Sequence, residues 1–215
     1  MSLTVVTQTN TDWNRDLTKC IESVEAALPP GAKHVIIKCD SDYDKFMQVR
    51  YNSMKLDDYV VFVDDDDYIS PDSLILAQEA LIKTDAGFAF TNEVKVYEDG
   101  KIVPSIFTKN YNLISAHPQM IHHMCVYNTK YVTERSIECA LRHGRGIEWI
   151  IKVDAASNAG AIHVPIVGYY WVQHAEQHHK LDTIRRLYAN NMEQIQKELS
   201  SWNTKTDKIP VWNIN

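Results

Sequence analysis

The sequence predicts an α/β fold with a mostly parallel central sheet flanked by helices. Short apolar or β-branched runs alternate with helical patterns over residues 3–84, the order that strand–helix–strand units require. One run, 59–63, is apolar at every position, which is typical of a strand buried on both faces of a parallel sheet. Hydrophobic residues make up 45% of the chain and charged residues 23%, an ordinary globular composition that supplies a sizeable core.

The first half of the chain contains three predicted strand–helix pairs. Apolar residues at helical spacing run from Leu17 to Leu28, and Pro29-Pro30-Gly31 stops that helix. Ser70 is the expected N-cap of the third helix, with Pro71 at its first position. We therefore expect strands over 3–9, 33–40 and 59–63, each followed by a helix, the later two over 41–55 and 70–84.

After residue 86 the alternation loosens. Asp99-Gly100 predicts the turn of a hairpin over 87–107. The remaining expected elements are a strand over 119–129, helices over 130–144 and 146–160, one or two strands over 161–174, and an amphipathic helix over 180–202. Because no repeat or linker interrupts these elements, we expect the whole chain, 1–215, to form a single domain.

Charge, hydropathy and cysteine usage exclude several classes of protein. The net charge of -6 creates no global positive field for nucleic acid or an anionic membrane. No stretch approaches the ~18 apolar residues of a membrane span, so we expect no transmembrane segment. The four cysteines form no Cys-x-x-Cys pair, and the N-terminus lacks a signal-peptide pattern. A cytoplasmic protein with buried thiols is the expectation.

Four consecutive carboxylates, Asp64–Asp67, follow the apolar strand directly. A pair of such charges ~5 Å apart repels by about 3 kcal/mol at an effective dielectric of ~20, so the arrangement needs compensation. Ligands of open α/β sheets bind beyond the carboxyl ends of strands, where this cluster lies. Asp64 and Asp66 can point the same way, and two convergent carboxylates suit Mg²⁺ or Mn²⁺. The alternative is a solvated acidic turn.

The segment "FVDDDDYISPDSL" resembles the signature of glycosyltransferase family 2, in which a strand ends in an Asp cluster that precedes a Pro-Asp-started helix. "VIIKCDSDYD" and "GYYWVQH" resemble two further segments of that family. The resemblance implies a GT-A-like fold, described as a nucleotide-diphospho-sugar transferase sandwich. It also implies a metal-dependent, inverting transfer of a sugar to an acceptor hydroxyl. A UDP-sugar is the expected donor, and the acceptor is a glycan, a lipid-linked molecule, a protein or a modified nucleic-acid base.

The same resemblance assigns roles to individual residues and to parts of the chain. Asp66 would bind Mn²⁺ or Mg²⁺, Asp64 would contact the ribose or share the metal, and His174 would approach the metal or the diphosphate. Asp40 would accept from the nucleobase, Thr7 would line the same pocket, and Arg50 would contact the diphosphate. The implied nucleotide-sugar-binding lobe covers about 1–93, the acceptor lobe about 94–175, and a C-terminal helix and tail about 176–215.

Glu148 is the candidate catalytic base, because "RGIEWII" stands where the family has its late acidic motif. A transfer with inversion needs a base within hydrogen-bonding reach of the acceptor hydroxyl. The alternative role of Glu148 is that of a first-turn residue favoured by the helix dipole. Two other functions stay open: a phosphatase resembling the haloacid dehalogenases that uses Asp64 and Asp66, and a non-catalytic module that binds nucleotide sugars or carbohydrates.

Overall fold

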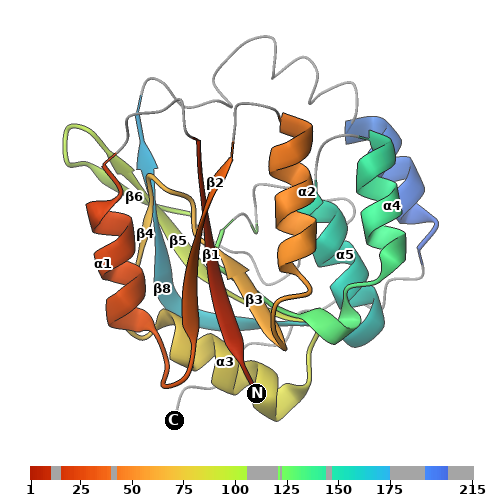
Figure 1. The fold of residues 1–215 in the computed structure, drawn as a ribbon, viewed down its shortest axis with the longest axis horizontal. Coiled ribbons are helices and arrows are strands. Elements are labelled where there is room, and N and C mark those ends of the chain that lie inside the picture. Colours follow the sequence, from red (N-terminus) through yellow and green to blue (C-terminus); the bar gives the residue numbers. More distant parts are fainter. Residues whose placement is uncertain are drawn as a thin grey trace.

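The computed structural model describes residues 1–10, 16–39, 43–105, 121, 123–143, 147–174 and 192–202, with the backbone alone at 43–47, 105, 141 and 147. Within them an eight-stranded sheet has the order β2-β1-β3-β7-β5-β8-β4, and β6 pairs with β5 (Figure 1). The strands are β1 (Leu3–Asn10), β2 (Lys33–Cys39), β3 (Tyr59–Phe62), β4 (Tyr68–Ile69), β5 (Phe88–Tyr97), β6 (Ile102–Ser105), β7 (Cys125–Asn128) and β8 (Ala161–Gln173).

Helices cover both faces of this sheet (Figure 1). They are α1 (Thr18–Ala27), α2 (Tyr43–Ser53), α3 (Ser73–Thr84), α4 (Glu134–His143) and α5 (Ile147–Ala159), with a 3-10 turn at Thr129–Tyr131. Residues 192–200 form a further helix, which lies within the terminal helix predicted over 180–202. Among the described residues, no helix has the length and apolar character needed to cross a membrane.

The sheet is mixed, which corrects the expectation of a mostly parallel one. The pairs β1–β2, β1–β3 and β5–β8 are parallel. The pairs β3–β7, β5–β7, β5–β6 and β4–β8 are antiparallel. A fully apolar strand such as β3 reveals that both of its faces are buried but does not reveal the direction of its neighbours. The antiparallel β7, inserted between β3 and β5, made that prediction wrong.

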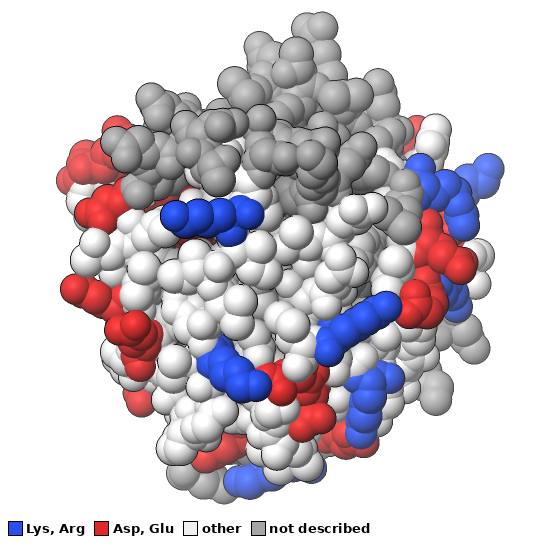
Figure 2. Space-filling model, in the orientation of Figure 1, with Lys and Arg blue, Asp and Glu red and all other residues white. Residues whose placement is uncertain are grey.

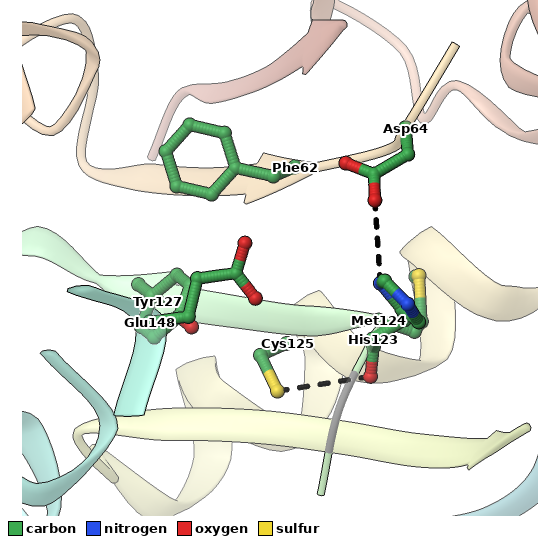
Figure 3. A pocket seen from close by; sticks show the side chains of 7 residues that line it. All are labelled: Phe62, Asp64, His123, Met124, Cys125, Tyr127 and Glu148. Carbon is green, nitrogen blue, oxygen red and sulfur yellow. Dashed lines mark hydrogen bonds and ion pairs between the residues drawn. The ribbon is translucent and has the colours of Figure 1, made fainter. Parts of the chain in front are cut away.

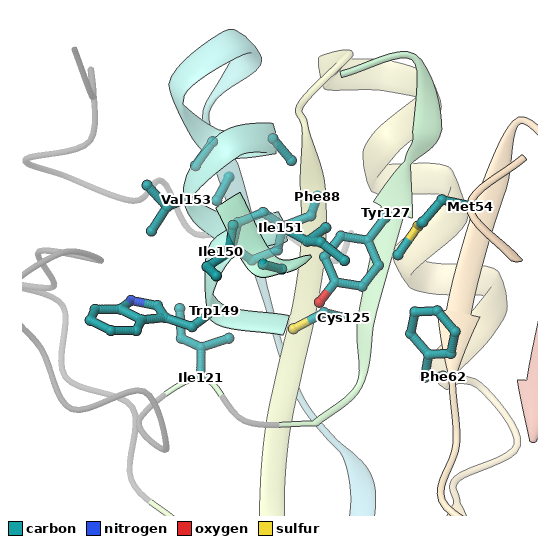
Figure 4. Packing of buried hydrophobic residues seen from close by; sticks show 14 of the residues in the cluster. Met54, Phe62, Phe88, Ile121, Cys125, Tyr127, Trp149, Ile150, Ile151 and Val153 are labelled. Atoms are coloured by element: carbon teal, nitrogen blue, oxygen red, sulfur yellow. The ribbon is translucent and has the colours of Figure 1, made fainter. Parts of the chain in front are cut away.

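Alternating side chains of β1 and β3 divide the core into two layers. Val5 and Val61 pack with α1 and α3 on one face, in the cluster that contains Cys20, Leu74 and Leu81. Val6 and Phe62 lie on the other face, where α5 and the helix of 192–200 supply Ile150, Ile195 and Leu199. Figure 4 shows Ile150 and Ile151 of α5 beside Phe88, Tyr127 and Cys125 of the sheet. The sheet therefore lies between two helical layers.

Gly87, just before β5, lets α5 lie close to the sheet. A Cβ at this position would clash with the backbone carbonyl of Ala155. Because backbone atoms cannot move aside as a flexible side chain can, Gly87 is needed for this contact. The close contact holds α5, and with it Glu148, against the inner strands.

Two local predictions have different outcomes. The hairpin turn is confirmed: Gly100 has φ of 81°, and its N–H donates to the carbonyl of Tyr97 over 2.9 Å. The third helix begins at Ser73 and not at Ser70. Strand pairing continues past β4, since the N–H of Ser70 donates to the carbonyl of Gly168 over 3.0 Å. Tertiary pairing with β8 thus takes the residues that local sequence assigned to the helix start.

Acidic and basic side chains are interspersed over the described part of the face shown in Figure 2. This distribution agrees with the modest net charge of the chain. All four cysteines are buried free thiols, as the sequence predicted.

Candidate active site

The four consecutive carboxylates lie immediately after β3 and alternate in burial. Asp65 and Asp67 are buried, with exposed fractions of 4% and 1%, whereas Asp64 and Asp66 are half-buried. The hydroxyl of Thr9, near the end of β1, donates to Asp65 over 2.7 Å. Burial therefore alternates along the cluster, while the convergence of Asp64 and Asp66 stays a prediction.

Asp67 anchors β8 to the carboxylate cluster. One of its oxygens accepts from the Tyr169 hydroxyl over 2.7 Å, and the other accepts from the Val172 N–H over 2.8 Å. Burial raises the pKa of Asp67 well above its ordinary value, and the negative charges of Asp64 and Asp66 raise it further. Asp67 consequently holds β8 against the segment after β3, a structural role that the sequence did not indicate.

Asp66 and His174 contact each other although they lie 108 positions apart in the sequence. Nε2 of His174 lies 2.7 Å from Oδ2 of Asp66, and both side chains are about one-fifth exposed. The pairing of β4 with β8 brings them together. β4 begins two residues after Asp66, and β8 ends at the residue before His174. Two of the three predicted metal ligands are thus in direct contact.

Asp64, the third predicted ligand, contacts Arg50 and His123. The Arg50 guanidinium donates to Oδ1 of Asp64, and Nδ1 of His123 lies 3.8 Å from Oδ2. Arg50 is buried in α2 and also donates through Nε to Oε1 of Gln8 on β1 over 2.7 Å. Its guanidinium carbon lies 4.9 Å from the centre of the Phe62 ring, within the range of a cation–π contact.

Arg50 also forms an ion pair with Glu148, the candidate base. Glu148 is in the first turn of α5, as its alternative role requires, but it also faces the site. Lys152, one helical turn later, places Nζ 3.8 Å from Glu148 and donates to the carbonyl of Ile121 over 2.7 Å. Burial lowers the pKa of Lys152. The structure therefore joins Arg50, Asp64 and Glu148 in one network.

A small pocket opens at this network (Figure 3). The residues lining it come from β3, the segment after it, the segment before β7, β7 and α5: Phe62, Asp64, His123, Met124, Cys125, Tyr127 and Glu148. In Figure 3 the Glu148 carboxylate points toward the side of the pocket on which Phe62 and Asp64 lie. The pocket thus has two carboxylates and one imidazole beside the side chains of Phe62, Met124, Cys125 and Tyr127.

His123 is a site residue whose position sequence reasoning did not identify. The His123 ring stacks on the Tyr169 ring with centroids 4.6 Å apart. The backbone N–H of His123 donates to Oε2 of Glu93 over 3.2 Å. Alternation within "HHMC" showed only that one of His122 and His123 would face inward. Asp64, Asp67 and His123 each have one potential ligand atom, and these three atoms lie within 4.8 Å of one another. The three residues therefore form a second possible metal-ligand group.

Two predicted nucleotide contacts have a different outcome. Asp40 lies outside the described residues. Thr7 is fully buried, and its hydroxyl lies 2.9 Å from Nε2 of His34. Thr7 lies inside β1, which continues to Asn10, and Thr9 is the threonine that reaches the carboxylate cluster.

No protein-family model and no curated protein sequence matches the chain. Its fold is similar to that of TarS from S. aureus, a GT-A-like glycosyltransferase. The crystal structure of TarS 1–349 matches 95% of this chain with a TM-score of 0.61 and 15% identity. A longer TarS structure matches 95% with a TM-score of 0.64, and the TarS 1–349 complex with UDP-GlcNAc matches 93% with a TM-score of 0.61, each at 16% identity.

The chain spans 66% of TarS 1–349, 72% of the chain in the UDP-GlcNAc complex and 41% of the longer TarS chain. At this identity the likeness concerns the fold. The GT-A-like fold predicted from the sequence is thereby confirmed, while membership of family 2 stays a prediction.

Proposed function

We propose that this protein is a metal-dependent glycosyltransferase that moves a sugar from a UDP-sugar to an acceptor hydroxyl with inversion. The observation that carries the proposal is the position of Arg50 between Asp64 and Glu148. A buried guanidinium beside the carboxylate cluster is suited to a diphosphate, and Glu148 lies within its reach as a potential base.

The donor is bound through three kinds of contact in this proposal. Arg50 donates hydrogen bonds to the diphosphate, Asp64 accepts from the ribose or shares the metal, and Asp40 accepts from the nucleobase. The likeness in fold to TarS, which was crystallised with UDP and with UDP-GlcNAc, supports a uridine donor. The buried thiols support the expected cytoplasmic, reducing setting.

Asp66, Asp64 and His174 would hold Mn²⁺ or Mg²⁺. The half-buried carboxylates of Asp64 and Asp66 supply hard oxygen ligands, and the contact between Asp66 and His174 places an imidazole beside Asp66. When bound, the ion would act as a Lewis acid that neutralises charge on the departing diphosphate. Asp67 is less suited than Asp66, because each of its oxygens accepts a hydrogen bond and its pKa is raised by burial.

Glu148 would accept the proton of the acceptor hydroxyl. Its ion pair with Arg50 must loosen before it can do so, and a diphosphate that binds Arg50 would compete for the same guanidinium. We therefore propose that the donor binds first and frees Glu148 for the acceptor.

The test is a donor screen by calorimetry with the full chain, using UDP, UDP-GlcNAc, other UDP-sugars and GDP-sugars, each with and without Mn²⁺. We expect one UDP-sugar to bind only with the metal, and release of UDP once glycan, lipid-linked, protein or nucleic-acid acceptors are supplied. Hydrolysis of a phosphate monoester without sugar transfer would favour the phosphatase. Donor binding without UDP release from any acceptor class would favour the non-catalytic module.

A further inference from the structure

Three side chains that commonly bind metals meet at the edge of the molecule, away from the pocket. Cys139 and His143 belong to α4, and Glu198 belongs to the helix of 192–200. One potential ligand atom from each of the three lies within 4.8 Å of the other two. In Figure 1 the blue helix of 192–200 lies beside α4, and contacts of Arg142 and His143 with Glu198 join the two helices.

The spacing of Cys139 and His143 places them on one face of α4. Residues four apart on a helix are neighbours, and paired helical zinc ligands use the same spacing. Cys139 is buried, and the side chains of His143 and Glu198 are 10% and 25% exposed. Nε2 of His143 lies 2.8 Å from Oε2 of Glu198. The three ligand atoms therefore converge at a partly enclosed point between the helices.

We propose that Cys139, His143 and Glu198 form a zinc site that fastens the helix of 192–200 to α4. Sulfur, imidazole and carboxylate donors together match Zn²⁺, with water at the fourth tetrahedral position. Bonds of about 2.0–2.3 Å place tetrahedral ligand atoms roughly 3.5 Å apart, so small rotations of these side chains suffice. The sulfur ligand disfavours Mg²⁺ and Mn²⁺, which separates this site from the carboxylate cluster after β3.

Metal binding at this point is coupled to loss of protons. Burial raises the pKa of the Cys139 thiol to about 12, and the negative charge of Glu198 adds to this effect, while Arg142 and Arg135 oppose it. Zinc must displace the thiol proton of Cys139. Binding should therefore release protons to the buffer and weaken as the pH falls.

The same residues without a metal form an ion-pair cluster, and the two arrangements depend on different side chains. Glu198 accepts from Arg142 over 2.7 Å and contacts His143, and it also shares a side-chain hydrogen bond with Cys139. A zinc site requires Cys139 but not Arg142. The ion pairs of the metal-free cluster require Arg142, whereas loss of the neutral Cys139 thiol leaves both of them in place.

The experiment uses the full chain, freed of metal with a chelator and titrated with zinc alone. We expect one zinc ion per chain whose binding depends on Cys139 and, at a free zinc concentration of about 100 times its Kd, a rise in Tm of roughly 5 °C or more. Cys139→Ala should abolish both effects, whereas Arg142→Gln and the distant Cys20→Ser should retain them. Asp66→Asn should also retain them, because its carboxylate belongs to the cluster after β3 and contacts His174.

Cobalt provides a second test that needs no variant to fold. Co²⁺ bound at this site should give the intense near-ultraviolet band of a thiolate-to-cobalt transition. A wild-type chain that lacks this band, or a Cys139→Ala chain that keeps the zinc-dependent rise in Tm, would overturn the proposal.

Discussion

Arg50 and Glu148 form an ion pair that joins α2 to the first turn of α5 at the side of the pocket. The Arg50 side chain is 8% exposed and the Glu148 side chain 23% exposed, so water screens the pair poorly. Because Arg50 also binds Asp64, one guanidinium neutralises two carboxylates from different elements. The pair thus has a stabilising role alongside its proposed role in donor binding.

Replacing Arg50 should destabilise the fold. Arg50→Met leaves Asp64 and Glu148 without their shared cation, and removing one partner of a buried pair costs about 3 kcal/mol. The matched control is Arg142→Met, since Arg142 is 60% exposed in its pair with Glu198 and should cost under about 1 kcal/mol. Urea unfolding measures both free energies. Equal stability of the two variants would contradict the structural role of Arg50.

Glu148→Gln should lower kcat by a factor of about 100 or more, because a neutral amide cannot accept the acceptor proton. The KM for the donor should not rise, since Glu148 makes no proposed donor contact and its loss removes the competition for Arg50. Glu134→Gln is the control, because Glu134 begins α4 with a side chain that is 73% exposed. Steady-state assays of UDP release measure both variants. Undiminished kcat in Glu148→Gln would remove Glu148 from the catalytic role.

Asp66→Asn should abolish the effect of Mn²⁺ on donor binding, and His174→Gln should weaken it, because these two side chains meet at the proposed ion. Asp72→Asn, at the exposed position before α3, serves as the control. Calorimetry with UDP-sugar and Mn²⁺ measures the effect. If Asp67→Asn instead loses the metal effect while Asp66→Asn keeps it, the ion is held by Asp64, Asp67 and His123.

Stability should fall as the pH drops below 6.5. Burial lowers the pKa of His34 and of His163 from the ordinary value of 6.5, so the unfolded chain binds more protons than the folded chain in this range. Their contribution is present above 6.5 and is lost as the pH falls through the lowered folded pKa values. The double variant His34→Gln/His163→Gln should show a flatter dependence of unfolding free energy on pH. An unaltered slope would contradict this assignment.

Much of the local structure could be predicted from the sequence. The strand–helix order, the hairpin turn at Gly100 and the alternation of Asp64–Asp67 follow from side-chain periodicity and turn chemistry, which act between near neighbours. The start of α3 could not be predicted in this way, because pairing with β8 extends through Ser70. The complete burial of Thr7 inside β1 was also missed.

The candidate site was predicted in its parts but not in its connections. Asp64, Asp66, His174, Arg50 and Glu148 were each named from the sequence. The contacts of Arg50 with Asp64 and Glu148, and of Asp66 with His174, were not predicted, because they depend on the order of strands in the sheet. His123 and Lys152 join the site through β7 and α5 in the same way, and no local pattern distinguishes them from other buried or helical residues.

By itself the sequence determined the order of strands and helices in the first half of the chain, and it placed an acidic cluster at the end of a buried strand. Only the tertiary structure decided that Arg50 lies between Asp64 and Glu148 and that α4 meets the helix of 192–200 at Cys139. The physical reason is that periodicity sets the direction of a side chain from its own backbone, whereas long-range packing of the whole core selects which elements become neighbours.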